Sequence, residues 1–292
     1  MDNTIILYLV LFLFAGAVCF ADTHIPAGDV FGTWEASGSP YYIDGEIHIP
    51  TDSMLVIEPG CSIIFSGAFK FVVDSNAVLK AMGTETDSVF FTPQYSFVHW
   101  YGIKFNFSAD GCTLSYCRIE YSDSSGIYCY NSSPTITNNT ISGNSAQDGG
   151  GIYCYYYSSP TISNNTINGN SASNYGGGIL AGNGSNIIIF NSILYSDSAD
   201  TGGNEIYIDS SATMTVIYIA YSDIDSADCF IETGAGGIVW GAGNINENPL
   251  FEDTMFHLSA GSPCIDAGAE SVYVSIWDTI IYAPEYDLKA AL

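Results

Sequence analysis

Acidic side chains are concentrated between residues 197 and 232, and they are the residues of this chain best suited to acid–base chemistry. They are Asp197, Asp200, Glu205, Asp209, Asp223, Asp225, Asp228 and Glu232. A glycoside hydrolase needs two carboxyl groups at a set separation, one as general acid and the other as base or nucleophile. The candidates for such a catalytic pair are Asp197, Asp200, Asp223 and Asp225. Because these acids lie among Ser and Gly in predicted turns, solvated acidic loops are the alternative interpretation.

Asp223 and Asp225 are also candidate calcium ligands. Hard cations favour carboxylate and carbonyl oxygens on loops, and the spacing of these two residues suits such a site. The complete calcium-loop pattern is absent, and the scattered histidines match no zinc site. Calcium is therefore the one candidate cofactor.

Tyrosines supply a second kind of candidate site. Two copies of one segment carry them in alternation with other residues, as Tyr128, Tyr130, Tyr153 and Tyr155. Side chains alternate between the two faces of a strand, so all four rings are expected on the outer face. An aromatic ring with a hydroxyl group suits contact with sugars at a wet surface, and we expect a ligand-binding strip. The alternative is that the rings only support neighbouring strands.

The strong excess of acidic over basic residues limits the classes of partner and substrate that this chain is expected to bind. Asp and Glu outnumber Lys and Arg by 31 to 5, which gives a formal net charge of −26. Such a field repels phosphate backbones, so nucleic acid is not an expected partner. Arg118 is the only arginine, and residues 119–288 contain no Lys or Arg. A lyase that acts on uronates needs a basic side chain near the abstracted proton, so the sequence disfavours a pectate lyase.

The first residues resemble an export signal. Residues 5–18 are apolar but too few to span a membrane comfortably, and small residues follow, so we expect a signal peptide over 1–21 with cleavage after Ala21. The mature chain is then secreted or lies at the cell surface, without a membrane span. Lipidation at Cys19 is the alternative.

Cysteines are expected inside the fold. After removal of the leader they are Cys61, Cys112, Cys117, Cys129, Cys154, Cys229 and Cys264. The chain is too long to need a disulfide framework and the cysteine spacings match no zinc site, so we interpret most of them as small buried hydrophobic residues. A disulfide between Cys129 and Cys154 is the alternative.

An internal repeat organises the chain. Residues 126–129, Gly-Ile-Tyr-Cys, return at 151–154, and in both copies Ser-Ser-Pro-Thr-Ile and Asn-Asn-Thr-Ile follow. A step of about 25 to 27 residues is typical of a solenoid, and decaying copies on both sides predict roughly four to six coils. The short apolar runs lack helical spacing and are expected to be strands.

Stacking the copies predicts the register of the strands. One inward column would contain Ile103, Ile127, Ile152 and Ile179, and a second Phe105, Cys129, Cys154 and Ala181. The outward column between them would contain Lys104, Tyr128, Tyr153 and Leu180. The paired asparagines at 138–139 and 164–165, with Asn191, are expected at sharp bends, where Asn tolerates left-handed backbone angles and stacked amides bond from coil to coil.

The repeat, together with features at both ends, resembles the right-handed parallel β-helix family, especially its exported bacterial members. The N-terminal features are residues 55–60, 63–65, 79–84 and 89–92. Residues 248–251, 257–258 and 262–268 resemble the closing segment of choice-of-anchor type surface proteins. In such relatives the chain continues past a segment like 285–288, so the resemblance implies a truncated or unanchored member.

The expected fold is all-β, a single-stranded right-handed parallel β-helix (solenoid) with capping segments at both ends. Its expected parts are a signal peptide (1–21), an N-terminal cap (22–43), the β-helix (44–245) and a truncated C-terminal capping segment (246–292). The expected function is noncatalytic, with an elongated face that binds a polysaccharide or another surface component. A polysaccharide hydrolase with a carboxylate pair is the alternative, and a purely structural stalk the third.

Overall fold

The computed structural model describes residues 22–210, 213–274 and 277–283. The predicted leader, 1–21, and the segment 285–288 lie outside the described residues. Within those ranges no helix is long and apolar enough to cross a membrane.

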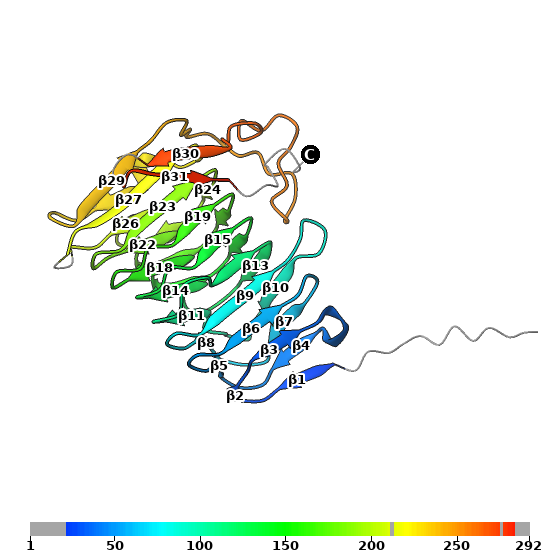
Figure 1. Cartoon of the computed structure of the whole chain (residues 1–292). Helices are drawn as coiled ribbons and strands as arrows, with labels where there is room; N and C mark the ends of the chain where they lie inside the picture. Colours follow the sequence, from blue (N-terminus) through cyan, green and yellow to red (C-terminus); the bar gives the residue numbers. More distant parts are fainter. Residues whose placement is uncertain (1–21, 211–212, 275–276, 284–292) are drawn as a thin grey trace, which may run out of the picture.

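The chain winds into a solenoid whose coils add one strand at a time to three parallel sheets (Figure 1). Sheet A contains β1 (Thr23–Ile25), β4 (Tyr41–Ile43), β7 (Ser62–Phe65), β10 (Val89–Pro93), β13 (Cys117–Glu120), β16 (Thr140–Ser142), β20 (Thr166–Asn168) and β24 (Ile193–Tyr195). Sheet B contains β2 (Gly28–Asp29), β5 (Ile47–Ile49), β8 (Phe71–Val73), β11 (Ile103–Asn106), β14 (Ile127–Tyr130), β18 (Ile152–Tyr155), β22 (Ile179–Ala181), β26 (Ile206–Ile208) and β28 (Cys229–Ile231). Sheet C contains β3 (Gly32–Trp34), β6 (Met54–Ile57), β9 (Val78–Met82), β12 (Thr113–Ser115), β15 (Thr135–Thr137), β19 (Thr161–Ser163), β23 (Asn186–Phe190), β27 (Thr215–Ala220) and β29 (Gly236–Trp240).

Smaller elements decorate the solenoid. A short parallel sheet at the corner between sheets A and B contains β17 (Ser145–Asp148), β21 (Ser171–Tyr175) and β25 (Ser198–Ala199). The antiparallel hairpin β30 (Ser271–Val274) and β31 (Thr279–Tyr282) follows the last coil. Two short 3-10 helices are η1 (Ala36–Gly38) and η2 (Ser226–Asp228).

The predicted register of sheet B is confirmed. Ile127 pairs with Ile103 on one side and Ile152 on the other, and Cys129 pairs with Phe105 and Cys154. These inward side chains are fully buried. Tyr128 and the residues paired with it point outward, because the strand period of two fixes the opposite face.

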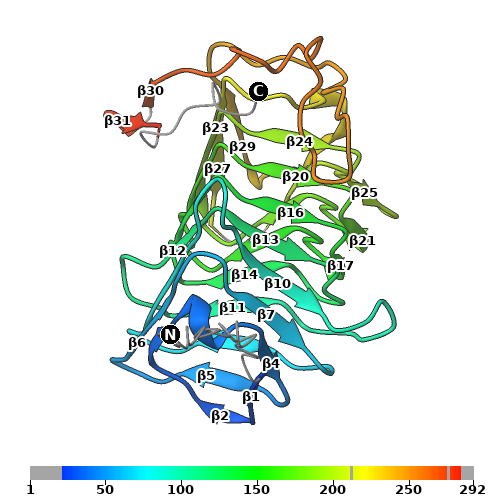
Figure 2. The ribbon, with the colours of Figure 1, turned by 90° about the vertical axis from the view of Figure 1, so that its right-hand side faces the viewer.

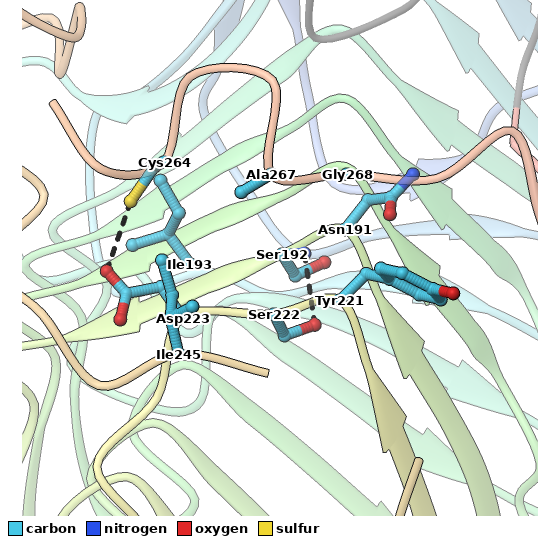
Figure 3. Close-up of a pocket in the computed structure, with 10 residues that line it drawn as sticks. All are labelled: Asn191, Ser192, Ile193, Tyr221, Ser222, Asp223, Ile245, Cys264, Ala267 and Gly268. Atoms are coloured by element: carbon cyan, nitrogen blue, oxygen red, sulfur yellow. Dashed lines mark hydrogen bonds between the residues drawn. The ribbon is translucent and has the colours of Figure 1, made fainter. Parts of the chain in front are cut away.

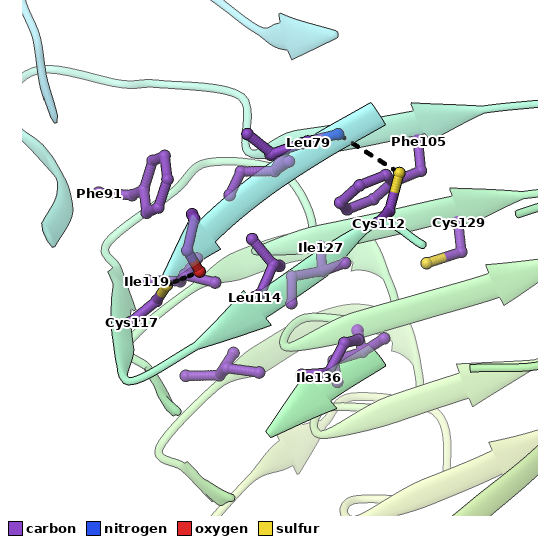
Figure 4. Close-up of a cluster of buried hydrophobic side chains, with 14 of the residues drawn as sticks. Leu79, Phe91, Phe105, Cys112, Leu114, Cys117, Ile119, Ile127, Cys129 and Ile136 are labelled. Atoms are coloured by element: carbon purple, nitrogen blue, oxygen red, sulfur yellow. Dashed lines mark hydrogen bonds between the residues drawn. The ribbon is translucent and has the colours of Figure 1, made fainter. Parts of the chain in front are cut away.

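The interior is a continuous apolar core in which cysteines fill small positions. Figure 4 shows side chains of successive strands converging on it, with the Leu79 N–H donating to Cys112 Sγ over 3.5 Å. Each fully buried isoleucine contributes roughly 1.5–3 kcal/mol by leaving water. The Cys129 and Cys154 thiols lie in register on neighbouring strands and are free, so the structure does not contain the disulfide that was the alternative.

The first coil begins earlier than the repeat indicates. Residues 22–43, expected as an N-terminal cap, contain β1, β2 and β3, which pair in parallel with the next strands of all three sheets. The described strands stack eight or nine high, so the expectation of four to six coils was too low. The coils at the two ends of the solenoid keep inward apolar side chains. They lack the Gly-Ile-Tyr-Cys and Asn-Asn motifs by which the central coils were recognised in the sequence.

Asparagines shape the corners, as expected. Asn138, Asn164 and Asn191 have φ values of 56°, 56° and 50°, in the left-handed region. Beside them Asn139 Nδ2 donates to Asn165 Oδ1 over 3.1 Å and to the Leu114 carbonyl over 2.9 Å. These residues are structural.

The chain after the last coil folds back over two sides of the solenoid (Figure 2). Leu258 and Cys264 pack on Ile193 of sheet A. Val272 and Val274 of the hairpin pack on the outer face of sheet C, against Phe190 and other residues. Among the described residues, these apolar contacts cover parts of sheets A and C, and the outer face of sheet B carries the predicted tyrosines.

Candidate ligand-binding groove

The outer face of sheet B is lined by aromatic rings. Tyr128 and Tyr153 lie side by side on neighbouring coils, with ring centroids 5.1 Å apart in an edge-to-face arrangement. Lys104, one coil earlier in the same column, places its Nζ 5.3 Å from the centre of the Tyr128 ring. This cation–π contact holds the lysine against the ring and keeps its charge on this face.

The other two predicted tyrosines lie beside the first pair. Tyr130 and Tyr155 have ring centroids 6.4 Å apart, and Tyr155 lies 5.8 Å from Tyr153. The structure therefore brings all four predicted tyrosines together in one half-buried cluster. Their chemistry with a ligand stays a prediction.

Two of these rings form one wall of an open groove of about 340 Å³ at the corner between sheets A and B. Its lining residues are Lys70, Tyr101, Lys104, Ser124, Ser125, Tyr128, Ala146, Gln147, Asp148 and Tyr153. The groove thus combines aromatic rings with hydroxyl, amide, ammonium and carboxylate groups. Such a mixture of apolar surface and a few polar groups is typical of ligand sites.

Asp148 stands out in this groove because one of its oxygens lacks a partner. Among the described residues, no hydrogen-bond donor reaches the buried Asp148 Oδ1. Buried acceptors are normally satisfied, so this oxygen is an exception among the residues that line the groove. Two of the chain's five basic residues, Lys70 and Lys104, line the same groove.

Tyr128 and Tyr153 carry neutral hydroxyl groups. Burial raises the pKa of Tyr128 above its usual value of 10.0, and burial with the charge of Asp148 among its neighbours raises that of Tyr153. Both rings can therefore donate a hydrogen bond at any physiological pH.

Part of this aromatic surface was not predicted from the sequence. Tyr156 stacks on Tyr130 with a centroid distance of 5.1 Å and an interplanar angle of 6°, and Phe107 packs edge-on against Tyr130. A signal for Tyr156 was present, since the second copy reads Tyr-Cys-Tyr-Tyr-Tyr where the first reads Tyr-Cys-Tyr-Asn. The extra residue lengthens the turn and lifts Tyr156 and Tyr157 into the left-handed region, with φ values of 56° and 60°.

The candidate carboxylates Asp223 and Asp225 are used by the fold. Asp223 is buried under the C-terminal segment, where its Oδ2 accepts from Cys264 Sγ at 3.1 Å and its Oδ1 from the Glu247 N–H at 3.0 Å (Figure 3). The cavity there measures about 20 Å³, which is water-sized and too small for a sugar. Asp225 caps η2 by accepting from the Ala227 N–H at 2.8 Å.

The candidate carboxylates Asp197 and Asp200 differ in their exposure to solvent. Asp197 is buried and faces Glu205, whereas Asp200 is exposed after β25. Among the other acids, Asp228 accepts from Asn204 Nδ2 at 2.9 Å and Glu232 from the Ser210 N–H at 2.9 Å. Asp209 is half-buried, and burial raises its pKa. The structure therefore brings Asp197 and Glu205 together, but in the interior and away from the groove lining.

No group of three or more His, Cys, Asp or Glu side chains is arranged to hold a metal ion in the part of the chain that the structure describes. Asp223 and Asp225 direct their carboxylates to separate partners. Calcium at these positions stays a prediction without support from the side-chain geometry.

Comparison with known proteins places the fold in a family. Residues 46–193 and, in an overlapping match, residues 83–256 match the family model described as "Right handed beta helix region". The chain belongs to the right-handed β-helix family. The expected right-handed parallel β-helix is thereby confirmed. No curated protein and no solved structure matched this β-helix chain in the same comparisons.

Proposed function

We propose that this β-helix protein is a noncatalytic glycan-binding protein whose ligand lies in the sheet B groove. The observation that carries the proposal is the groove itself, in which Tyr128 and Tyr153 form one wall and the carboxylate-bearing Asp148 also lines the space. A sugar presents C–H faces that pack on aromatic rings and hydroxyl groups that donate to a carboxylate. Lys104 and Gln147 would complete the contacts, since each can donate to a sugar oxygen.

The charge of the protein favours neutral glycans over polyanions. A formal charge of −26 repels a polyuronate or a nucleic acid at long range, and a neutral sugar experiences no such repulsion. Display or adhesion at a cell surface fits this role and rests on the predicted leader, 1–21. The hydrolase alternative has no comparable observation in its favour, because the two acids that come together, Asp197 and Glu205, are buried.

Affinity electrophoresis through gels that contain neutral or acidic polysaccharides tests the proposal. We expect at least one neutral polymer to retard the wild-type protein, and Asp148→Asn or Tyr153→Ala to lose most of the retardation. Tyr273→Ala is the matched control, since Tyr273 is exposed on β30. Reducing-sugar release from the same polymers would contradict the noncatalytic part of the proposal, and equal retardation of all variants would contradict the site.

A further inference from the structure

A second column of side-chain amides runs through the corner between sheets A and B. Asn144 Nδ2 donates to Asn170 Oδ1 over 2.9 Å, and Asn170 Nδ2 donates to Asp197 Oδ1 over 2.9 Å. Each asparagine amide also donates to a backbone carbonyl of an earlier coil, that of Ile119 or Ile141, over 3.0 Å. The column therefore consists of two asparagines followed by one aspartate.

Asp197 cannot continue this pattern as an ionised residue. Its Oδ1 accepts from both Asn170 donors, the backbone N–H at 2.6 Å and Nδ2 at 2.9 Å. Its Oδ2 stands where the asparagines carry their donating NH₂ group, and a carboxylate oxygen has no hydrogen to donate. Asp197 is 6% exposed, and no donor among the described residues reaches Oδ2.

Glu205 brings a second carboxyl group to the same place. Register in sheet B places it in the column of Gly126, Gly151 and Gly178, one residue before the stacked isoleucines. This column lies against the amides, since a Cβ on Gly178 would come within 2.7 Å of Asp197 Oδ2. Glu205 is 3% exposed, and its Oε2 also lacks a donor within the described ranges.

We propose that Asp197 and Glu205 share one proton, and that loss of this proton loosens the coil between β24 and β28, which makes the pair a pH-sensitive switch. Two buried carboxylates within hydrogen-bonding reach repel each other, and a proton between them supplies the missing donor. The proposal is independent of glycan binding.

The described groups that act on this pair are uncharged or acidic. Asn170 Nδ2 donates a hydrogen bond to Asp197. The charges of Asp225 and Asp228 raise the pKa of Glu205. The charge of Glu205 in turn contributes to the raised pKa of the Cys229 thiol. The sequence contains no Lys or Arg from 119 to 288. Burial and repulsion by Glu205 hold the pKa of Asp197 well above its usual range, and burial raises the pKa of Glu205 to about 7.

Amide substitution tests the shared proton directly. Asp197→Asn restores the donor of the column, and Glu205→Gln supplies one from the other side, so neither variant needs a proton between the pair. We expect the thermal midpoint of the wild-type protein to fall between pH 5 and pH 9 and that of either amide variant to change much less. Asp200→Asn is the matched control, because it makes the same charge change at an exposed position and should keep the wild-type profile.

Infrared spectroscopy gives a readout that does not depend on the stability of the variants. The C=O stretch of a protonated carboxylic acid should persist at pH 6 in the wild-type protein and in Asp200→Asn, and disappear in the double variant Asp197→Asn/Glu205→Gln. Absence of this band in the wild type, or equal pH profiles for the wild type and Asp197→Asn, would overturn the proposal. A wild-type midpoint that calcium or sodium ions restore at pH 9 would instead indicate a cation between the carboxylates and would overturn it as well.

Discussion

The Asn170 side-chain Nδ2 donates a hydrogen bond to Asp197 Oδ1 on the next coil. The hydrogen-bonded column that begins with Asn144 and Asn170 therefore ends in an aspartate. The Asn170 side chain accepts from Asn144 and donates to the Ile141 carbonyl, which makes it the central member of a buried network. Removing one member of such a network leaves several polar groups without partners.

Asn170→Ala should therefore lower the free energy of unfolding by about 3 kcal/mol, because it leaves Ile141, Asn144 and Asp197 each short of a partner. Asn168→Ala is the control, since the half-buried Asn168 amide makes a hydrogen bond to the Tyr195 carbonyl over 2.8 Å and should cost about 1 kcal/mol. Urea unfolding measures both. Equal losses of unfolding free energy in the two variants would show that the hydrogen-bonded column stabilises the protein no more than a single half-buried hydrogen bond does.

The pH dependence of stability follows from Glu205. Its pKa lies at about 7 in the folded protein against 4.5 for an ordinary glutamate, so the folded state binds more protons between these values. The contribution is fully present below pH 4.5 and is lost as pH rises towards 7, at up to about 1.4 kcal/mol per pH unit. Urea unfolding at a series of pH values should show this fall, and a stability that rises steadily from pH 5 to pH 7 would disagree with it.

The cysteines should be unreactive while the protein is folded. Burial raises the pKa of Cys61 to about 11 and that of Cys264 to about 12, so neither forms a thiolate at pH 8. The half-buried Cys229 also has its pKa raised, to about 12, by burial and by nearby acids. Iodoacetamide labelling followed by mass spectrometry should find little modification without denaturant and full modification in it; fast labelling of Cys129 or Cys154 in the native protein would contradict the buried register.

Arg118 forms a buried contact between sheet A and the returning C-terminal segment. Its Nε donates to Glu120 Oε1 over 2.9 Å, and its Nη1 lies 2.6 Å from Met255 Sδ. Glu120→Ala leaves this cation unpaired and should lower the free energy of unfolding by about 3 kcal/mol. The double variant Arg118→Met/Glu120→Leu removes both charges and should recover most of the loss. If the double variant were less stable than Glu120→Ala, the ion pair itself would be the stabilising element.

The register of the central coils could be predicted because two signals agree there. Ile127 and Cys129 repeat at Ile152 and Cys154, and the period of two fixes which side chains enter the core. The first coil could not be predicted in this way, since Thr23 and Tyr41 carry no repeat signature although they pair in the same sheet.

The groove escaped prediction for a different reason. Lys70 and Asp148 lie on coils that are far apart in sequence, and they occupy different columns of the repeat. No sequence spacing therefore indicates that both residues line one groove. The role of Asp197 did leave a signal, because Ser-Asp-Ser-Ala at 196–199 repeats Gly-Asn-Ser-Ala at 143–146 and 169–172. In that alignment Asp197 occupies the position of a buried asparagine of the repeat. This placement favours a structural role for Asp197 over a role as a catalytic acid.

Isothermal titration with an oligosaccharide of the neutral polymer that retards the protein most strongly tests the glycan-binding groove most directly. We expect the Kd of Tyr128→Ala/Tyr153→Ala to be about 100-fold weaker, because each lost ring contact costs roughly tenfold, or about 1.4 kcal/mol. Tyr273→Ala should bind as the wild type does, and circular dichroism should show the same fold for all three proteins. An unchanged Kd in the double variant would contradict the groove as the binding site, and failure of the wild type to bind any glycan tested would contradict the proposed function.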